Sequence, residues 1–286
     1  MPETREIEEI ILEQDRRGMA ALRQYLPTDY CSEAAQFILD KPGTVFIATG
    51  FYIFASGTVE TDGPPGALAL GNALAAIGFT PIYVTDQFAA PYMKEIAQGS
   101  EMVIFPLVHH AESILVASKI LSEYSPTTLI AIERCAMTQS GHHRNMSGLD
   151  ISKYTARLDY LFYQHQRTVG IGDGGNEIGL GNLKNHIPNV ENLPKDPSNV
   201  STTHLIIAGT SNWGAYGLIA AMSLLVQKNL LPTREAEEKV IRQLVDLGAV
   251  DGLEAKRQPT VDTFSMESNN KVLLRLHHVV EKGIAA

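Results

Sequence analysis

A glycine-rich segment at residues 170–179 carries the clearest chemical pattern in this chain. Its sequence is GIGDGGNEIG, and its glycines permit positive φ angles and a close approach of the backbone to a ligand. Asp173, Asn176 and Glu177 add side-chain oxygens, which are the ligands that Mg²⁺ and Mn²⁺ prefer. The alternative is a simple turn with an acidic cap on the following helix. The segment is therefore either a cation site or a turn that caps the following helix, and both interpretations stay open.

The same segment contains a G-x-G-x-x-G pattern, which binds a dinucleotide in some α/β proteins. Here the pattern begins inside a predicted strand rather than after it. Asp173 also stands where a pyrophosphate would lie, and its negative charge would repel that group. We therefore expect no nucleotide cofactor.

A second acidic loop, at residues 57–66, ends in the sequence GPPG. Glu60 and Asp62 supply carboxylates, and the two prolines stiffen the start of the next helix. Backbone N–H groups at Gly63 and Gly66 would suit a substrate carboxylate or phosphate. The alternative is a capping turn with two solvated acids.

Glu133 and Arg134 directly follow a strongly apolar run, so we expect them at the edge of the sheet. Arg134 either holds a substrate carboxylate through two hydrogen bonds or forms an ion pair with Glu133. His142 and His143 follow in the next loop and are candidate acids or bases. Adjacent side chains diverge, so at most one of these histidines should point inward, and both could simply be exposed.

The elements that position these residues alternate along the chain between strand and helix. Helix-like stretches lie at 66–77, 88–98, 110–123, 151–166 and 214–228. Six β-rich runs separate most of them, at 44–48, 81–85, 101–105, 127–132, 168–171 and 203–208. This alternation predicts an α/β fold with a mostly parallel, doubly wound (Rossmann-like) sheet and helices on both faces.

Ligands of such folds bind beyond the carboxyl ends of the strands. Most of the glycine-rich and polar clusters of this chain follow predicted strands, so they should meet at one edge of the sheet. Besides the loops above, the residues expected to contact a substrate there are Thr49, Gly50, Asn145, Ser211 and Asn212. This one-sided clustering is the main argument for a site.

The domain organisation is expected to be simple. We expect an N-terminal helical segment at 1–40 and an α/β catalytic domain at 41–286. An alternative that stays open is a small second lobe formed by the two termini. Residues 182–200 are rich in Asn and Pro and predict a long loop or flap. Surface helices are expected at 233–247 and 268–283.

Composition limits the function classes. The 286 residues carry a formal net charge of −9, and no basic cluster is present, so nucleic acid is not an expected partner. Cys31 and Cys135 lie far apart and in no metal-binding spacing, which disfavours a disulfide framework. The acidic N-terminus does not resemble a signal peptide, and no apolar run reaches about 18 residues. We expect a cytoplasmic enzyme that does not associate with membranes; a homo-oligomer is left open.

The motifs quoted so far also form a recognisable set. They are Thr49-Gly50, the acidic loop from Glu60 to Gly66, Ile132-Glu133-Arg134, Asn145-Met146, Asp159, the segment at 170–179, and the run from Ser211 to Gly214. Together they resemble the D-glutamate cyclase-like family over residues 40–265. The chain departs from that pattern at Leu180 in place of Met, at Cys135-Ala136 in place of a Gly-containing turn, and at Thr263 in place of a Gly after Asp262.

The resemblance implies a lyase that converts D-glutamate to 5-oxo-D-proline with loss of water, acting on a small acidic amino acid. A divalent cation, Mg²⁺ or Mn²⁺, would neutralise the γ-carboxylate. We expect its ligands among Asp173, Asn176, Glu177 and Glu133. Glu60 and these acids are the candidate catalytic groups, with Asp62 close by, and Arg134 and the 63–66 loop would hold the α-carboxylate. Two alternatives stay open: a Mg²⁺- or Mn²⁺-dependent phosphatase acting on a small phosphorylated metabolite, and a non-catalytic sensor of acidic amino acids.

Overall fold

Six parallel strands form the central sheet of the computed structural model, which describes residues 2–285. They are β1 (Thr44–Thr49), β4 (Thr80–Thr85), β5 (Met102–Ile104), β6 (Thr128–Ile132), β7 (Thr168–Gly172) and β8 (His204–Ile207), in the spatial order β5-β4-β1-β6-β7-β8. Each of the six predicted β-rich runs forms one of these strands. The chain winds outward from β1 in both directions, which confirms the predicted doubly wound, Rossmann-like sheet.

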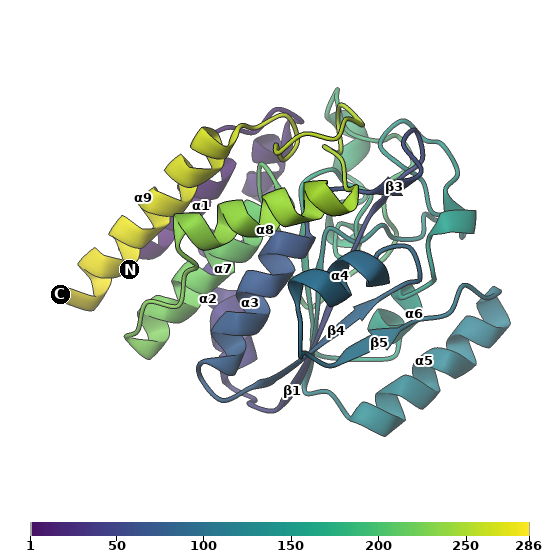
Figure 1. Cartoon of the computed structure of the whole chain (residues 1–286), viewed down its shortest axis with the longest axis horizontal. Coiled ribbons are helices and arrows are strands. Elements are labelled where there is room, and N and C mark those ends of the chain that lie inside the picture. Colours follow the sequence, from purple (N-terminus) through teal and green to yellow (C-terminus); the bar gives the residue numbers. More distant parts are fainter. Residues whose placement is uncertain (1, 286) are drawn as a thin grey trace.

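Helices cover both faces of this sheet (Figure 1). They are α1 (Pro2–Leu12), α2 (Tyr30–Leu39), α3 (Pro64–Ala75), α4 (Ala90–Ile96), α5 (His110–Tyr124), α6 (Asp159–Tyr163), α7 (Ser211–Val226), α8 (Arg234–Leu247) and α9 (Met266–Ala285). Figure 1 shows α2, α3 and α7 on one side of the strands and α5 and α6 on the other. No helix within residues 2–285 combines the length and the apolarity needed to cross a membrane.

The strand β1 shows how alternating side chains build the two faces. Val45 and Ile47 belong to the large apolar cluster that also contains residues of α2, α3 and α7. Phe46 and Ala48 point the opposite way, into a second cluster with residues of α5 and α6. Successive side chains of a strand point to opposite faces, so a strand buried on both sides is apolar throughout.

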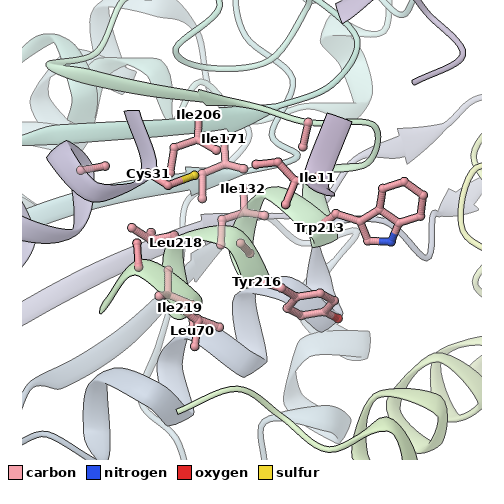
Figure 2. Packing of buried hydrophobic residues seen from close by; sticks show 14 of the residues in the cluster. Ile11, Cys31, Leu70, Ile132, Ile171, Ile206, Trp213, Tyr216, Leu218 and Ile219 are labelled. Carbon is pink, nitrogen blue, oxygen red and sulfur yellow. The ribbon is translucent and has the colours of Figure 1, made fainter. Parts of the chain in front are cut away.

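Helix α7 is buried on almost all sides and packs against the sheet, with its N-terminus at the carboxyl edge. Its contacts are with α1, α2, α3 and α9 as well as the strands. Figure 2 shows the packing of α7 residues Trp213, Tyr216, Leu218 and Ile219 near strand residues Ile132, Ile171 and Ile206. Because this packing fixes α7, the N-terminus of the helix is held firmly at the edge where the site lies.

Two stretches differ from the prediction. The helix expected at 151–166 is mostly irregular, with one short 3₁₀ helix (Ser152–Tyr154) and the short α6. The backbone N–H of Ala156 donates to Asp86 Oδ2, and its carbonyl accepts from Arg134, so tertiary contacts replace helical hydrogen bonds there. The structure also contains an unpredicted hairpin of β2 (Tyr52–Ile53) and β3 (Thr58–Val59).

The loop expected at 182–200 is confirmed, apart from the short 3₁₀ helices Gly181–Leu183 and Ile187–Asn189. The boundary expected after residue 40 stays a prediction. Helix α1 contributes Ile7, Ile10 and Ile11 to the same apolar cluster as the sheet, and the chain then turns before a 3₁₀ helix at Met19–Tyr25.

Candidate active site

Six buried carboxyl groups gather at the carboxyl edge of the sheet. They are Glu60, Asp62, Glu133, Asp173, Glu177 and Asp262, each at most 5% exposed. The first five were candidates from the sequence, and the structure brings them together. Burying charge away from water is costly unless cations or hydrogen-bond donors compensate, so the partners of each acid determine what the site can do.

A cavity of about 280 Å³ opens above these acids. Its polar lining is Arg17, Glu60, Glu133, Asn145, Ser147, Asp173, Asn176 and Glu177. Phe51, Tyr52 and Phe54 of the β2–β3 region form an apolar wall of the cavity. Leu253, in the loop after α8, also lines it. The space suits a small molecule that carries both charged and apolar parts.

Glu133 directly follows β6 and has an unusual backbone conformation, with φ at +46°. Its Oε2 accepts a hydrogen bond of 2.6 Å from the Ser211 hydroxyl at the start of α7. Burial, together with the charges of Asp173 and Glu177, raises the pKa of Glu133 well above its usual range. A strained backbone conformation persists only where the surrounding structure stabilises it, and such residues are common at functional sites.

The loop after β7 folds around Glu177. Glu177 Oε1 accepts hydrogen bonds from the backbone N–H of Asp173 (3.2 Å) and of Gly174 (2.6 Å). Gly175 has φ at +90°, a conformation that side chains disfavour. Asn176 faces the pocket and donates to the Arg144 carbonyl. Glu177 Oε2 is buried and has no hydrogen-bond partner, so one ligand oxygen remains free.

Asp62 is bound by the N-terminus of α7. Its carboxylate accepts from the N–H groups of Ser211 and Asn212, both at 2.8 Å, and from Gly63 at 3.0 Å. Asn212 Oδ1 in turn accepts from the N–H of Gly63 (3.1 Å) and of Gly66 (2.8 Å). The two backbone N–H groups that were expected to bind substrate are therefore already used inside the protein.

Arg134 lies behind the site and does not line the pocket. Its guanidinium is 1% exposed and donates to Asp86 Oδ2 (2.6 Å), the Gly50 carbonyl (2.8 Å) and the Ala156 carbonyl (2.9 Å). Arg134 thus forms an ion pair with Asp86, and Glu133 is bound by Ser211 instead. Thr49 is likewise buried away from the pocket lining. The structure does not bring Arg134, Thr49 or Gly50 into contact with the cavity.

Two residues that the sequence did not nominate complete the site. Arg17 Nη1 donates to Asp173 Oδ2 at 2.6 Å, and Arg17 Nη2 donates to Asp262 Oδ2 at 2.8 Å. Burial raises the pKa of Asp173 to about 6 and that of Asp262 to about 7, against the opposing effect of Arg17. Arg17 has no local motif, and 245 residues separate it from Asp262, so no sequence pattern connects them.

Glu60 reaches the pocket because Gly252 leaves room for its side chain. A Cβ atom at position 252 would lie 1.8 Å from Glu60 Oε2, so another residue there would collide with the carboxyl group. Burial and the nearby charges of Asp262 and Asp62 raise the pKa of Glu60 well above its usual range. Burial therefore makes the Glu60 carboxylate a stronger base than an exposed glutamate.

The two candidate histidines diverge, as expected of neighbours. His143 is fully buried, and its Nε2 lies 2.9 Å from Asp159 Oδ2, whereas His142 is half exposed beside Asp150. Asp159 also accepts from the Met137 N–H, so the His143–Asp159 pair fixes the loop after β6. Neither histidine lines the cavity, although the same loop brings Asn145 to it.

Two sets of carboxylate oxygens are close enough to hold a metal ion. Oxygens of Glu133, Asp173 and Glu177 lie within 4.8 Å of one another, and so do oxygens of Asp62, Asp173 and Asp262. The donors are all oxygens, which suits a hard cation such as Mg²⁺ or Mn²⁺. The free, buried Glu177 Oε2 is an additional reason to expect a positive ligand at the first set.

Comparison with known proteins points to one family. A family model described as "D-glutamate cyclase-like, C-terminal" matches residues 7–277. The chain is also 28% identical over 274 residues to the mitochondrial D-glutamate cyclase of Homo sapiens. That alignment covers 88% of this chain and 43% of the human protein, so the chain spans less than half the length of this relative.

Proposed function

This chain belongs to the D-glutamate cyclase-like family, and we propose that it converts D-glutamate to 5-oxo-D-proline with loss of water. One observation carries the proposal beyond family membership. The cavity joins a cluster of buried acids to one guanidinium in a space of about 280 Å³. A small substrate with an amine and two carboxylates would use groups of both kinds.

The reaction closes a five-membered ring. The amine nitrogen attacks the γ-carboxyl carbon, a C–N bond forms, and a C–O bond breaks. Two protons leave the ammonium group, and the departing oxygen receives them as it becomes water. The protein must therefore accept a proton, compensate the carboxylate charge, and hold the two ends of the substrate close together.

We assign the cation site to Glu133, Asp173 and Glu177, with Asn176 beside them. A divalent cation bound there would neutralise the γ-carboxylate and the charge that develops on its oxygens. Ser211 keeps Glu133 directed toward the set, and the Asp173 and Gly174 N–H groups hold Glu177. These hydrogen bonds orient the ligands before any substrate arrives.

We assign proton transfer to Glu60. Its carboxyl group lines the cavity, and burial, which raises its pKa, makes its carboxylate a stronger base toward an ammonium group. Among the described residues that line the cavity, Arg17 alone is cationic, and its Nε has no hydrogen-bond partner. Arg17 therefore replaces Arg134 as the proposed partner of the α-carboxylate.

The test is an assay with D-glutamate and L-glutamate, each with Mn²⁺ or with EDTA. We expect 5-oxoproline from the D isomer only, identified by chiral chromatography, and its loss in EDTA. The variant Glu60→Gln should lose this activity, while Glu281→Gln, an exposed change on α9, should keep it. A folded protein that forms no lactam from either isomer would overturn the proposal.

The same samples address the two alternatives. Metal-dependent release of phosphate from p-nitrophenyl phosphate without lactam formation would indicate a phosphatase. Thermal stabilisation by glutamate without turnover would indicate a sensor, because a ligand that binds the folded state alone raises its melting temperature.

A further inference from the structure

The two sets of carboxylates share Asp173 but differ in how many oxygens remain available. In the set of Asp62, Asp173 and Asp262, four of the six carboxylate oxygens already accept hydrogen bonds. Both oxygens of Asp62 accept backbone N–H groups, and one oxygen each of Asp173 and Asp262 accepts from Arg17. Asp262 Oδ1 is buried and has no hydrogen-bond partner.

The set of Glu133, Asp173 and Glu177 is more open. Glu177 Oε2 has no partner, and Glu133 accepts one hydrogen bond, from Ser211. All three side chains line the cavity, so an ion can enter from solvent. A divalent cation therefore finds more free oxygens in this set, where Arg17 contacts Asp173 alone, whereas in the neighbouring set the guanidinium bridges Asp173 and Asp262.

Arg17 is held in place by the segment that carries it. Asp15 accepts hydrogen bonds from the N–H groups of Arg17, Gly18 and Ala20, which forms a tight turn after α1. The Gly209 N–H donates to the Ile11 carbonyl and ties the end of α1 to the loop before α7. A guanidinium keeps its charge at all ordinary pH values and fits two carboxylates with its planar array of donors.

We propose that Arg17 occupies the position of a second cation, so that the site binds one divalent ion, at Glu133, Asp173 and Glu177. This inference rests on the proposed cation-assisted function and specifies how the site achieves it. Two divalent ions would both draw on Asp173, and the guanidinium supplies fixed positive charge in place of one of them. If Arg17 is removed, the set of Asp62, Asp173 and Asp262 becomes open to a second ion.

The experiment counts bound Mn²⁺ in the absence of substrate. Isothermal titration with MnCl₂, checked by elemental analysis after gel filtration, should give one ion per chain for the natural protein and two for Arg17→Ala. Arg242→Ala removes an exposed arginine of α8 and should still bind one ion. Two ions in the natural protein, or one ion in folded Arg17→Ala, would overturn the inference.

A second pair of variants keeps the test decisive if Arg17→Ala does not fold. Asp262→Asn should still bind one ion, with a dissociation constant within about threefold of the natural value. Glu177→Gln should weaken binding by at least about tenfold, since even partners of metal ligands contribute that much. The reverse order would overturn the inference, and so would the absence of Mn²⁺ binding in the natural protein. The cyclase assay then shows separately whether the proposed function stands.

Discussion

Acidic side chains are buried in two very different ways in this protein. At the carboxyl edge of the sheet, the acids have backbone N–H groups, the Ser211 hydroxyl and the Arg17 guanidinium as partners. Between α3, α7 and α8, by contrast, Glu237 lies in a small cavity of about 50 Å³ beside Tyr216, with no cation or backbone donor bound to it. Burial raises the pKa of Glu237 to about 7.

The difference shows how the fold accommodates several buried acidic side chains beside one cavity. A lone buried carboxyl group holds its proton, because the charged form is poorly solvated. At the sheet edge, helix α7, the loop after β7 and Arg17 together supply enough positive and polar partners to concentrate acids beside a cavity. Substitutions near the sheet edge should therefore act on catalysis, on ion pairs or on local strain, whereas substitution of Glu237 should act on the pH dependence of stability.

Asp173→Asn should have the largest effect, because Asp173 belongs to both carboxylate sets and binds Arg17. We expect kcat/KM for cyclisation of D-glutamate to fall by about a thousandfold, or about 4 kcal/mol, with the fold retained. Steady-state kinetics measure kcat/KM, and circular dichroism shows whether the fold is retained. Asp246→Asn, an exposed change at the end of α8, is the control. A folded variant that keeps a tenth of the activity would mean that the acidic cluster is not the reaction centre.

Asp86→Ala should act on stability instead. It leaves the fully buried Arg134 without its carboxylate partner and removes the hydrogen bonds to the Ala156 and Phe88 N–H groups. Breaking a buried ion pair by removing one partner costs about 3–5 kcal/mol of unfolding free energy. Urea unfolding measures this loss. If the unfolding free energy of Asp86→Ala lies within about 1 kcal/mol of the natural value, the Arg134–Asp86 pair does not stabilise the fold.

Glu237→Gln should change the pH dependence of stability. The pKa of Glu237 is raised from 4.5 to about 7 in the folded state, so the folded protein binds this proton more tightly than the unfolded chain. Its stabilising contribution is complete below pH 4.5 and is lost as the pH rises toward 7 and beyond, for a total of about 3 kcal/mol. Relative to the natural protein, Glu237→Gln should therefore be more stable at pH 8 than at pH 5.

Urea unfolding at pH 5 and pH 8 measures that change. Glu281→Gln on α9 is exposed and should leave the pH dependence as it is. Parallel behaviour of Glu237→Gln and the natural protein at both pH values would show that folding does not raise the pKa of Glu237.

Thr263→Gly should have the smallest effect and tests strain beside the site. Asp262 and Thr263 have φ angles of +49° and +66°, and Thr263 stands where the resemblance noted above leads us to expect a glycine. A branched side chain in this conformation costs about 1–2 kcal/mol, and the entropy of glycine offsets part of the gain. Thermal unfolding should show stabilisation of about 1 kcal/mol. Thr233→Gly, at the start of α8, removes a helix cap at negative φ and should destabilise instead.

Equal destabilisation by the two threonine changes would contradict strain at position 263. Glu133 also has a positive φ angle, of +46°. Strain is thus present on both sides of the acidic cluster, and we expect its relief at 263 to leave the arrangement of Asp262 intact.

Local patterns were sufficient for most of the fold. Strands covered on both faces need continuous apolar runs, and the six runs each formed a strand of the sheet. Parallel strands place the loops that follow them at one edge, so Glu60, Glu133 and Glu177 could be brought together by pattern alone. The prediction of a helix over 151–166 was wrong, because Asp86 and Arg134 bind the Ala156 backbone. The spacing of apolar residues along the sequence contains no information about such distant partners.

The sequence by itself therefore determined the parallel, doubly wound sheet and the acidic character of the loops at its carboxyl edge. Only the tertiary structure decided which charges meet there. Arg17 and Asp262 lie near opposite ends of the chain, and the packing of α1 against α7 and α9 carries Arg17 to the sheet edge. Arg134, close in sequence to Glu133, is directed away from the cavity by Asp86. Secondary structure follows from periods of two to four residues, whereas ion pairs depend on contacts that no such period encodes.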